Sequence, residues 1–241
     1  MIAKRISRLM LLNFTLSIGA IAQELPSYIP QDNLVGWWPF NGNPDDESMN
    51  GNSGINHGCK LTADRFGIEN KAYYFDGIYS YIEVEMQNSS LQLKNNFTVS
   101  VWTNLKFNPY NSQSILCKGD NSSNEYSIIC SNEQYLTINR ENYDHNNLIY
   151  FSNHYNNWTN IICVYKTGIV LIYINGKFVA ANVLNAPILP SSLSLVFGAM
   201  FNIGTNTPVN GSYCIGDIDD IGIWNRVLST EEIYEIYLSS K

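Results

Sequence analysis

The chain has 241 residues, and its 14 lysines and arginines against 21 aspartates and glutamates give a net charge of -7. Apolar residues make up 45% of the sequence, which is enough for a hydrophobic core and argues against a disordered chain. Nucleic-acid binding requires clustered basic side chains, and past its first residues the sequence has no basic run. We therefore expect no nucleic-acid partner and a single domain, since all-β domains of roughly 200–250 residues are common.

The first residues have the layout of a secretory signal peptide. Basic residues between Lys4 and Arg8 precede an apolar stretch that ends in the small-x-small pattern of residues 20–22. This stretch is shorter than the roughly 20 apolar residues that a membrane-spanning helix needs. The sequence therefore predicts export to the periplasm or the extracellular space and no membrane span in the mature chain.

We divide the chain accordingly into residues 1–22 as signal peptide, 23–32 as a short N-terminal extension and 33–241 as the folded domain. Past residue 33, short aromatic and β-branched runs alternate with clusters of Asn, Gly, Ser and Asp, a pattern typical of strands and turns. The predicted strands are 34–40, 72–77, 80–85, 97–105, 112–119, 125–131, 135–141, 148–153, 158–168, 169–176, 178–184, 193–200 and 213–227.

The alternation within these runs indicates how they pack. Phe97, Val99, Val101 and Thr103 recur at every second position, which puts them on one buried face of a strand. About a dozen strands in one domain need two packed sheets, because a single sheet of that size leaves one face uncovered. The sequence thus predicts an all-β fold, a two-sheet antiparallel jelly-roll β-sandwich.

Two local signals fix a turn and a helix. The Asn175-Gly176 pair between two predicted strands is typical of a tight hairpin turn, because both residues tolerate positive φ. Near the end of the chain, Ser229 and Glu232 have the spacing of a capping box, and the apolar residues that follow recur at helical spacing. We therefore predict a short C-terminal helix.

The sequence contains five cysteines, an odd number that cannot all pair within one chain. Cys117 and Cys130 are the best local candidates for a disulfide, because they lie on two predicted strands joined by a polar turn. The alternative is that Cys130 and Cys163, each inside an apolar strand, are small buried hydrophobic residues.

Three segments contain motifs in a fixed order. Residues 34–84 include the sequences WPFNGN, DRFG and FDG, residues 158–180 read WTNIICVYKTGIVLIYINGKFVA, and residues 216–237 read GDIDDIGIWNRVLSTEEIYEIY. Together they resemble the laminin-G-like jelly-roll domains of the concanavalin A-like lectin/glucanase superfamily, of the type found in exported bacterial proteins. The resemblance covers residues 33–239. It implies the fold but not the ligand, because the family includes sugar-binding, adhesive and glycoside-hydrolysing members.

Two acidic clusters suggest a metal site. Asp46 lies in the polar loop 41–54, which contains several of the oxygen ligands that Ca²⁺ prefers. Asp219 and Asp220 lie in the last predicted strand, where alternation puts Asp219 on the face of Ile221; a core-facing carboxylate there must be paired or metal-bound. In the resembled superfamily a calcium ion commonly joins these two regions, so the resemblance implies calcium held by Asp46 and by Asp219 or Asp220. The alternative is that these acids only accept backbone N–H bonds in turns.

Aromatic residues make up 13% of the sequence, including 16 tyrosines. Aromatic rings pack on the C–H faces of sugars, and amide side chains bind sugar hydroxyls. Tyr110, Tyr143 and Tyr155 lie among asparagines and are therefore the candidate ligand contacts. The alternative is that they are ordinary strand and loop residues.

A catalytic site is not favoured. Glu83 and Glu85 lie two apart in one predicted strand, and paired carboxylates catalyse glycoside hydrolysis. The laminarinase-like relatives carry E-x-D-x-E or E-x-D-x-x-E there, whereas this strand reads EVEM and lacks the middle acid, so we favour a solvated strand face. His57, His145 and His154 have no paired metal spacing.

The sequence therefore predicts an exported, non-catalytic, calcium-containing module that binds an extracellular glycan. The alternatives are a module that adheres to a surface protein and a glycoside hydrolase of the laminarinase-like type.

Overall fold

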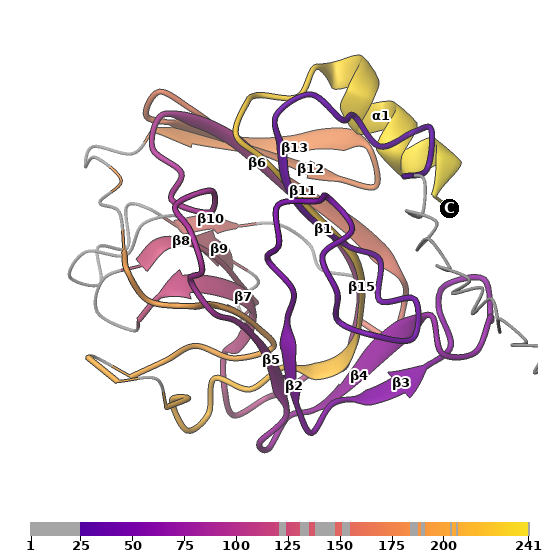
Figure 1. Cartoon of the computed structure of the whole chain (residues 1–241), viewed down its shortest axis with the longest axis vertical. Helices are drawn as coiled ribbons and strands as arrows, with labels where there is room; N and C mark the ends of the chain where they lie inside the picture. Colours follow the sequence, from indigo (N-terminus) through magenta and orange to yellow (C-terminus); the bar gives the residue numbers. More distant parts are fainter. Residues whose placement is uncertain are drawn as a thin grey trace, which may run out of the picture.

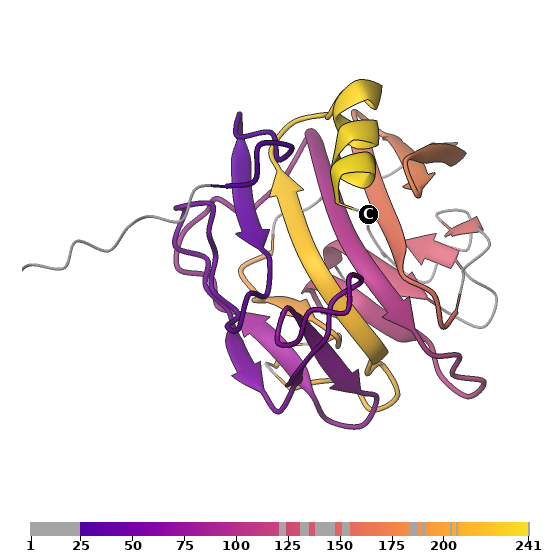
Figure 2. The same cartoon turned by 90° about the vertical axis from the view of Figure 1, so that its right-hand side faces the viewer.

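A computed structural model shows two antiparallel sheets stacked face to face (Figures 1 and 2). The predicted two-sheet β-sandwich is thus confirmed. The residues that the structure describes are 25–120, 124–130, 135–137, 148–150, 155–183, 188, 191–202, 204–205 and 207–240. The predicted signal peptide lies outside them and stays a prediction. No helix in this described part of the chain is long and apolar enough to cross a membrane.

In the described part of the chain, the larger sheet has eight strands. They are β1 (Leu34–Trp38), β3 (Lys60–Thr62), β4 (Ala72–Asp76), β6 (Asn96–Leu105), β11 (Thr159–Lys166), β12 (Ile169–Ile174), β13 (Lys177–Val183) and β15 (Ile215–Trp224). Their order is β13-β12-β11-β6-β15-β4-β3, and β1 also pairs with β15. The first and last strands of the domain therefore lie side by side.

Among the described residues, the smaller sheet has five strands in the order β2-β5-β14-β7-β8. They are β2 (Ile55–His57), β5 (Tyr81–Val84), β7 (Gln113–Gly119), β8 (Asn124–Cys130) and β14 (Leu195–Phe197). A separate pair is formed by β9 (Tyr135–Thr137) and β10 (Leu148–Tyr150). Every predicted strand overlaps an observed one. The sequence missed β2 and β3, because each is three residues long and lies in a polar segment without a buried alternating face.

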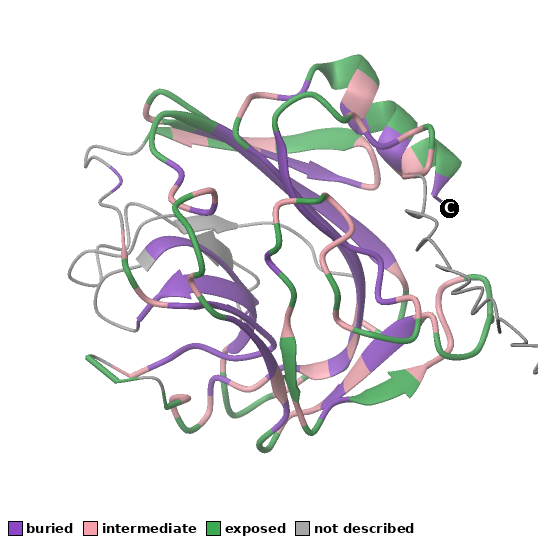
Figure 3. Ribbon diagram, in the orientation of Figure 1, coloured by how far each residue is buried: buried purple, intermediate pink, exposed green. Residues whose placement is uncertain are grey.

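The inner faces of the two sheets form one central core. Phe97, Val99 and Val101 of β6 belong to it, as the alternation predicted, and Leu116 and Phe197 meet them from the smaller sheet. Figure 3 shows the buried residues concentrated along the strands of both layers. The core therefore lies between the sheets, and each sheet keeps a second face for other contacts.

The outer face of the larger sheet is covered by α1 (Thr230–Ser239), which lies across it in Figure 2. The Ser229 hydroxyl accepts the N–H of Glu232, and the Glu232 carboxylate accepts the N–H of Ser229, so the predicted capping box is confirmed. Ile233 and Ile236 are buried in a second cluster together with Trp224 of β15. The helix is thus held by its apolar side.

The described residues of the N-terminal extension also belong to this second cluster, on the outer face of the larger sheet. Ile29 is 2% exposed and belongs to the same apolar cluster as the helix. The indole Nε1–H of Trp224 donates to the carbonyl of Pro30 at 2.7 Å. The residues just before the domain therefore pack against its last strand.

The last strand departs from the predicted alternation. Ile218 and Ile221 both face the central core, because the register of β15 against β6 shifts between Asp219 and Gly222. Asp220 has φ 46°, so the backbone turns there and accommodates an extra residue. We had expected Asp219 on the same face as Ile221. This expectation is wrong, because Asp219 lies opposite Trp102 on the outer face of the sheet.

The five cysteines are buried thiols. The pairing of β7 with β8 puts Cys117 opposite Ser127 and Cys130 opposite Gln113. Cys130 belongs to the central core, whereas Cys117 packs in a different cluster. The candidate disulfide between them is therefore not formed, and the alternative is confirmed, because Cys130 and Cys163 are each 1% exposed.

The hairpin between β12 and β13 provides a test of this packing. Gly176 has φ 71°, and a Cβ there would lie 2.9 Å from the Tyr237 ring of α1. Gly51 has a similar φ of 76° but no atom within 4 Å of the same position. We expect Gly51→Ala to lower the free energy of unfolding by about 1 kcal/mol through backbone strain alone, and Gly176→Ala by about 2 kcal/mol or more. Urea denaturation measures both, and equal losses would show that the helix does not pack on this turn.

Candidate functional site

Asp46 organises the loop between β1 and β2. Its Oδ1 atom accepts the N–H groups of Trp37 at 3.0 Å and Ser48 at 2.9 Å, and its Oδ2 accepts the N–H of Asn52 at 2.9 Å. Asn52 is itself buried and donates through Nδ2 to the carbonyl of Val35 at 2.7 Å. Both oxygens of Asp46 therefore hold the loop against β1, which is the alternative role given to this residue above.

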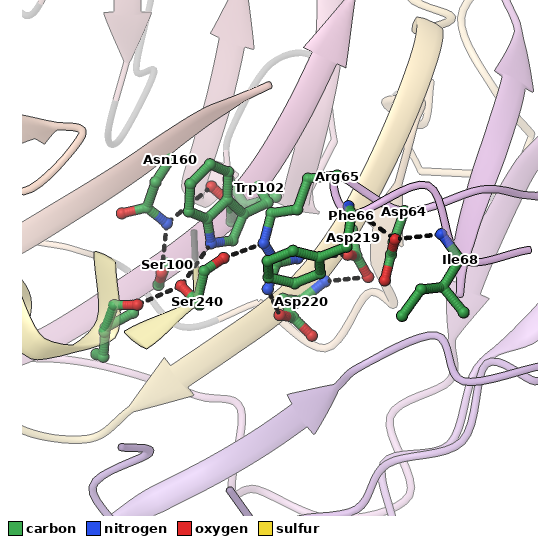
Figure 4. Close-up of polar contacts among 12 residues, drawn as sticks. Asp64, Arg65, Phe66, Ile68, Ser100, Trp102, Asn160, Asp219, Asp220 and Ser240 are labelled. Atoms are coloured by element: carbon green, nitrogen blue, oxygen red, sulfur yellow. Dashed lines mark hydrogen bonds and ion pairs between the residues drawn. The ribbon is translucent and has the colours of Figure 1, made fainter. Parts of the chain in front are cut away.

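Asp219 and Asp220 are bound by a buried arginine from the loop between β3 and β4. The Arg65 Nη1 lies 2.6 Å from Oδ2 of Asp219, and its Nη2 lies 2.6 Å from Oδ2 of Asp220. The three side chains are 6%, 3% and 11% exposed. Figure 4 shows the guanidinium between the two carboxylates. The two carboxylates predicted to bind a metal thus share one organic cation.

Further contacts hold the Arg65 side chain in place. Its guanidinium carbon lies 4.8 Å from the centre of the Trp102 ring and 4.7 Å from that of Phe66. Its Nε–H donates to the carbonyl of Ser240, just after α1, while the Ser240 hydroxyl accepts the Trp102 indole N–H at 3.0 Å. Figure 4 shows these contacts together. Arg65 therefore joins β15, β6 and the end of the helix.

Burial governs the electrostatics of this cluster. Loss of solvent raises the pKa of Asp219 and of Asp220, and the Arg65 charge opposes the rise. Burial also raises the pKa of Tyr28 to about 12, and the nearby charge of Asp220 adds to the effect. The two carboxylates are thus costly to ionise in this place unless a cation accompanies them.

A pocket of about 310 Å³ lies beside the ion pair. It is lined by Asp219 and Asp220 together with Glu47, Lys71 and Tyr28. Burial raises the pKa of Glu47, and the charge of Asp220 raises it further. The loop acid that shares this pocket with β15 is therefore Glu47 rather than the predicted Asp46.

The predicted ligands do not fit a calcium ion. Both oxygens of Asp46 accept backbone N–H groups, and Arg65 binds the carboxylates of β15. Across the residues that the structure describes, no group of three or more His, Cys, Asp or Glu side chains is placed to hold a metal. Calcium binding itself stays a prediction.

The structure describes two of the three candidate tyrosines. Tyr110, in the loop between β6 and β7, is 89% exposed, and its N–H donates to Oδ1 of Asn108 at 3.1 Å. Tyr155 is half-buried and lies edge-on to Phe107, with ring centres 5.3 Å apart. Tyr143 lies outside the described residues. Phe107, which is 52% exposed, lies just past the predicted strand 97–105 and was not among the sequence candidates.

A second cluster lies on the face of the smaller sheet that points away from the core. The rings of His57 and Tyr81 stack, with centres 4.3 Å apart and an interplanar angle of 8°. The Glu83 carboxylate accepts the hydroxyl of Ser194 at 2.6 Å through Oε1, and its Oε2 lies 3.5 Å from Nε2 of His57. We call these four residues the His57 cluster.

The environment of Glu83 corrects the expected solvated strand face. Glu83 is buried, at 8% exposure, whereas Glu85 lies past the end of β5 and is exposed. The two carboxylates, although only two positions apart, are in different environments. Of the three histidines, His57 lies in β2, and His145 and His154 lie outside the described residues.

These observations place the chain in a known family. A laminin G family model of the concanavalin A-like lectin/glucanases superfamily matches residues 76–234, which is well over half of the sequence. The chain therefore belongs to this superfamily, and the resemblance given by its sequence motifs is confirmed. No curated protein matches the sequence.

Solved structures with the same fold include domains from two kinds of protein. Domain 4 of a GH43 extracellular arabinanase from Geobacillus stearothermophilus, in complex with arabinotriose, has a TM-score of 0.64 and 16% identity, over 85% of this chain and 98% of that domain. The binding domain of Paraclostridial Mosquitocidal Protein 1 has a TM-score of 0.66 and 18% identity, over 87% of this chain and 53% of that one.

A third similar structure is the binding domain of Botulinum neurotoxin DC in complex with rat synaptotagmin II. It has a TM-score of 0.67 and 17% identity, over 88% of this chain and 52% of that one. The chain thus spans about half the length of the toxin binding domains and nearly all of the arabinanase domain. At these identities the likeness shows the fold.

The role of Asp46 can be tested by one substitution. Asp46→Asn keeps the size of the side chain but replaces one acceptor oxygen by an NH₂ group that faces backbone donors. We expect the free energy of unfolding to fall by about 2–3 kcal/mol, because hydrogen bonds to a charged acceptor are lost. Asp45→Asn is the matched control, since Asp45 is exposed and should change stability by less than about 0.5 kcal/mol. Denaturant unfolding of both variants measures the difference, and a loss no larger than that of the control would contradict the structural role.

Proposed function

We propose that this protein is an exported, non-catalytic binding module that recognises a saccharide through the His57 cluster. The observation that carries the proposal is the stacked pair of His57 and Tyr81 beside a carboxylate that is already oriented by a hydrogen bond. Stacked rings offer a flat apolar surface, and a carboxylate accepts hydrogen bonds from neighbouring sugar hydroxyls. The combination matches the two kinds of surface that a sugar ring presents.

The cluster is organised before any ligand binds. Ser194 fixes one oxygen of Glu83, and His57 lies next to the other. Tyr81 packs edge-on to Phe201, with ring centres 6.0 Å apart. Side chains that are already fixed lose little conformational freedom on binding, so more of the contact energy contributes to affinity. The His57 side chain is 37% exposed, so a ligand can reach this edge of the cluster.

A non-catalytic role is supported by the separation of the acids. Glycoside hydrolysis requires two carboxyl groups on either side of the scissile bond. Glu83 is bound to Ser194 inside the cluster, whereas Glu85 lies exposed beyond the end of β5. Glu83 is therefore placed to accept hydrogen bonds, and Glu85 is not placed to act with it as a catalytic acid and base pair.

Two further observations support a saccharide and an extracellular location. One of the similar structures, the arabinanase domain, was solved with arabinotriose, and a Botulinum neurotoxin binding domain was solved in complex with SialylT. The first 22 residues have the layout of a secretory signal peptide, which would deliver the domain to polysaccharides outside the cytoplasm.

The test is a printed array of plant, bacterial and animal oligosaccharides that includes arabinotriose, followed by calorimetry with the tightest binder. We expect His57→Ala and Glu83→Gln each to weaken binding by about tenfold, the equivalent of one good polar or stacking contact. Glu85→Gln, two positions away and exposed, is the matched control and should leave the affinity unchanged.

Two outcomes would contradict the proposal. If no saccharide binds, the module is not a lectin. If a saccharide binds but its affinity depends on Tyr110→Ala and not on the His57 cluster, the ligand lies at the loop between β6 and β7.

A protein partner is the second candidate, and a specific surface favours it. The edge of the larger sheet carries four exposed apolar side chains, Ile169, Phe178, Val179 and Val183, with exposed fractions of 41%, 56%, 46% and 59%. Exposed apolar groups on an edge strand and its neighbour, here β13 and β12, are typical of contacts with other proteins. One of the similar toxin domains is bound to synaptotagmin II. This alternative would be favoured if the protein binds no oligosaccharide on the array but binds a polypeptide, and if Phe178→Ser abolishes the polypeptide binding.

A further inference from the structure

The bulge in β15 creates an unusual requirement for charge. Asp219 and Asp220 are adjacent in the sequence, and both side chains are buried, at 3% and 11% exposure. Two neighbouring buried carboxylates repel each other and lose their hydration, so the fold must place a positive charge between them. A bound divalent cation is one solution, and it is the solution that the sequence suggested.

The structure contains a different solution, because Arg65 supplies the charge from within the chain. Its two terminal nitrogens each lie 2.6 Å from one carboxylate, so a single planar group serves both acids. Its Nε–H binds the carbonyl of Ser240, and its flat face packs on Trp102. Every part of the guanidinium thus has a partner that is already in place.

Three of the four carboxylate oxygens of Asp219 and Asp220 are also engaged. Oδ1 of Asp219 accepts the N–H of Asp220 at 2.9 Å, and the Oδ2 atoms of both residues face Arg65. On the other side, both oxygens of Asp46 accept N–H groups of the loop. A divalent ion placed between these groups would be repelled by the guanidinium and would have to displace backbone donors.

We propose that the Arg65 guanidinium is the resident cation of this site, and that the folded domain needs no bound Ca²⁺. The arginine connects the loop after β3 to the last strand and to the end of α1. It thereby neutralises the two carboxylates of the last strand for which the family resemblance implied a calcium ion.

The first test uses the unmodified protein. After purification we expect no stoichiometric calcium by elemental analysis and no heat of binding when CaCl₂ is titrated into the EDTA-treated protein. The Tm should be the same, within about 1 °C, in EDTA and in millimolar CaCl₂, because a ligand that binds only the native state at 100-fold excess over its Kd shifts Tm visibly. One bound calcium per chain with a Tm that falls in EDTA would overturn the proposal.

The second test removes the charge of Arg65. Arg65→Met keeps most of the side-chain volume and should lower the Tm by about 10 °C, because it leaves two buried carboxylates without a cation. Adding Asp219→Asn and Asp220→Asn to Arg65→Met should recover a large part of this loss. Lys71→Met is the matched control, since Lys71 lines the same pocket and should change the Tm by less than about 2 °C.

The triple variant separates charge from packing. If Arg65 contributes only by filling space, the Tm of Arg65→Met will be close to that of the unmodified protein. Adding Asp219→Asn and Asp220→Asn will then not raise the Tm. That result would contradict the proposal even if the protein binds no calcium.

Discussion

The structure depends on how the carboxylates at the bulge of β15 are neutralised. β15 lies between β6 and β4 and also pairs with β1. Unpaired charges in β15 would therefore destabilise the strands at the centre of the larger sheet. The bulge turns Asp219 and Asp220 to the outer face, where burial would make both charges unstable. Arg65 removes this cost and, through Ser240 and Trp102, joins the strand to the end of α1 and to β6.

The two outer faces of the sandwich have different chemistry, and this division supports the proposed function. The outer face of the larger sheet is covered by α1 and by the residues around Ile29, so it contributes mainly to stability. The outer face of the smaller sheet keeps the His57 cluster, where stacked rings lie next to an oriented carboxylate. In the proposed function, the larger sheet serves stability and the smaller sheet is available for recognition.

The candidate site could be predicted only in part. The acids Asp46, Asp219 and Asp220 were selected because the family resemblance implied them, but the partner of Asp219 and Asp220 is far away in the sequence. Arg65 belongs to the DRFG motif, yet nothing in that motif says that it contacts residues more than 150 positions later. His57 and Glu83 likewise meet only because β2 pairs with β5, and β2 is too short and too polar to show a strand pattern.

By itself, the sequence determined what depends on neighbours along the chain: the alternating strands, the Asn175-Gly176 turn and the Ser229 capping box, all of which the structure contains. It also determined the superfamily, because the motifs occur in order. Only the tertiary structure decided which face the acids of β15 occupy and which cation meets them. The reason is physical: one extra residue in a strand reverses the side-chain alternation, and the partner of a buried charge is chosen by distance in space.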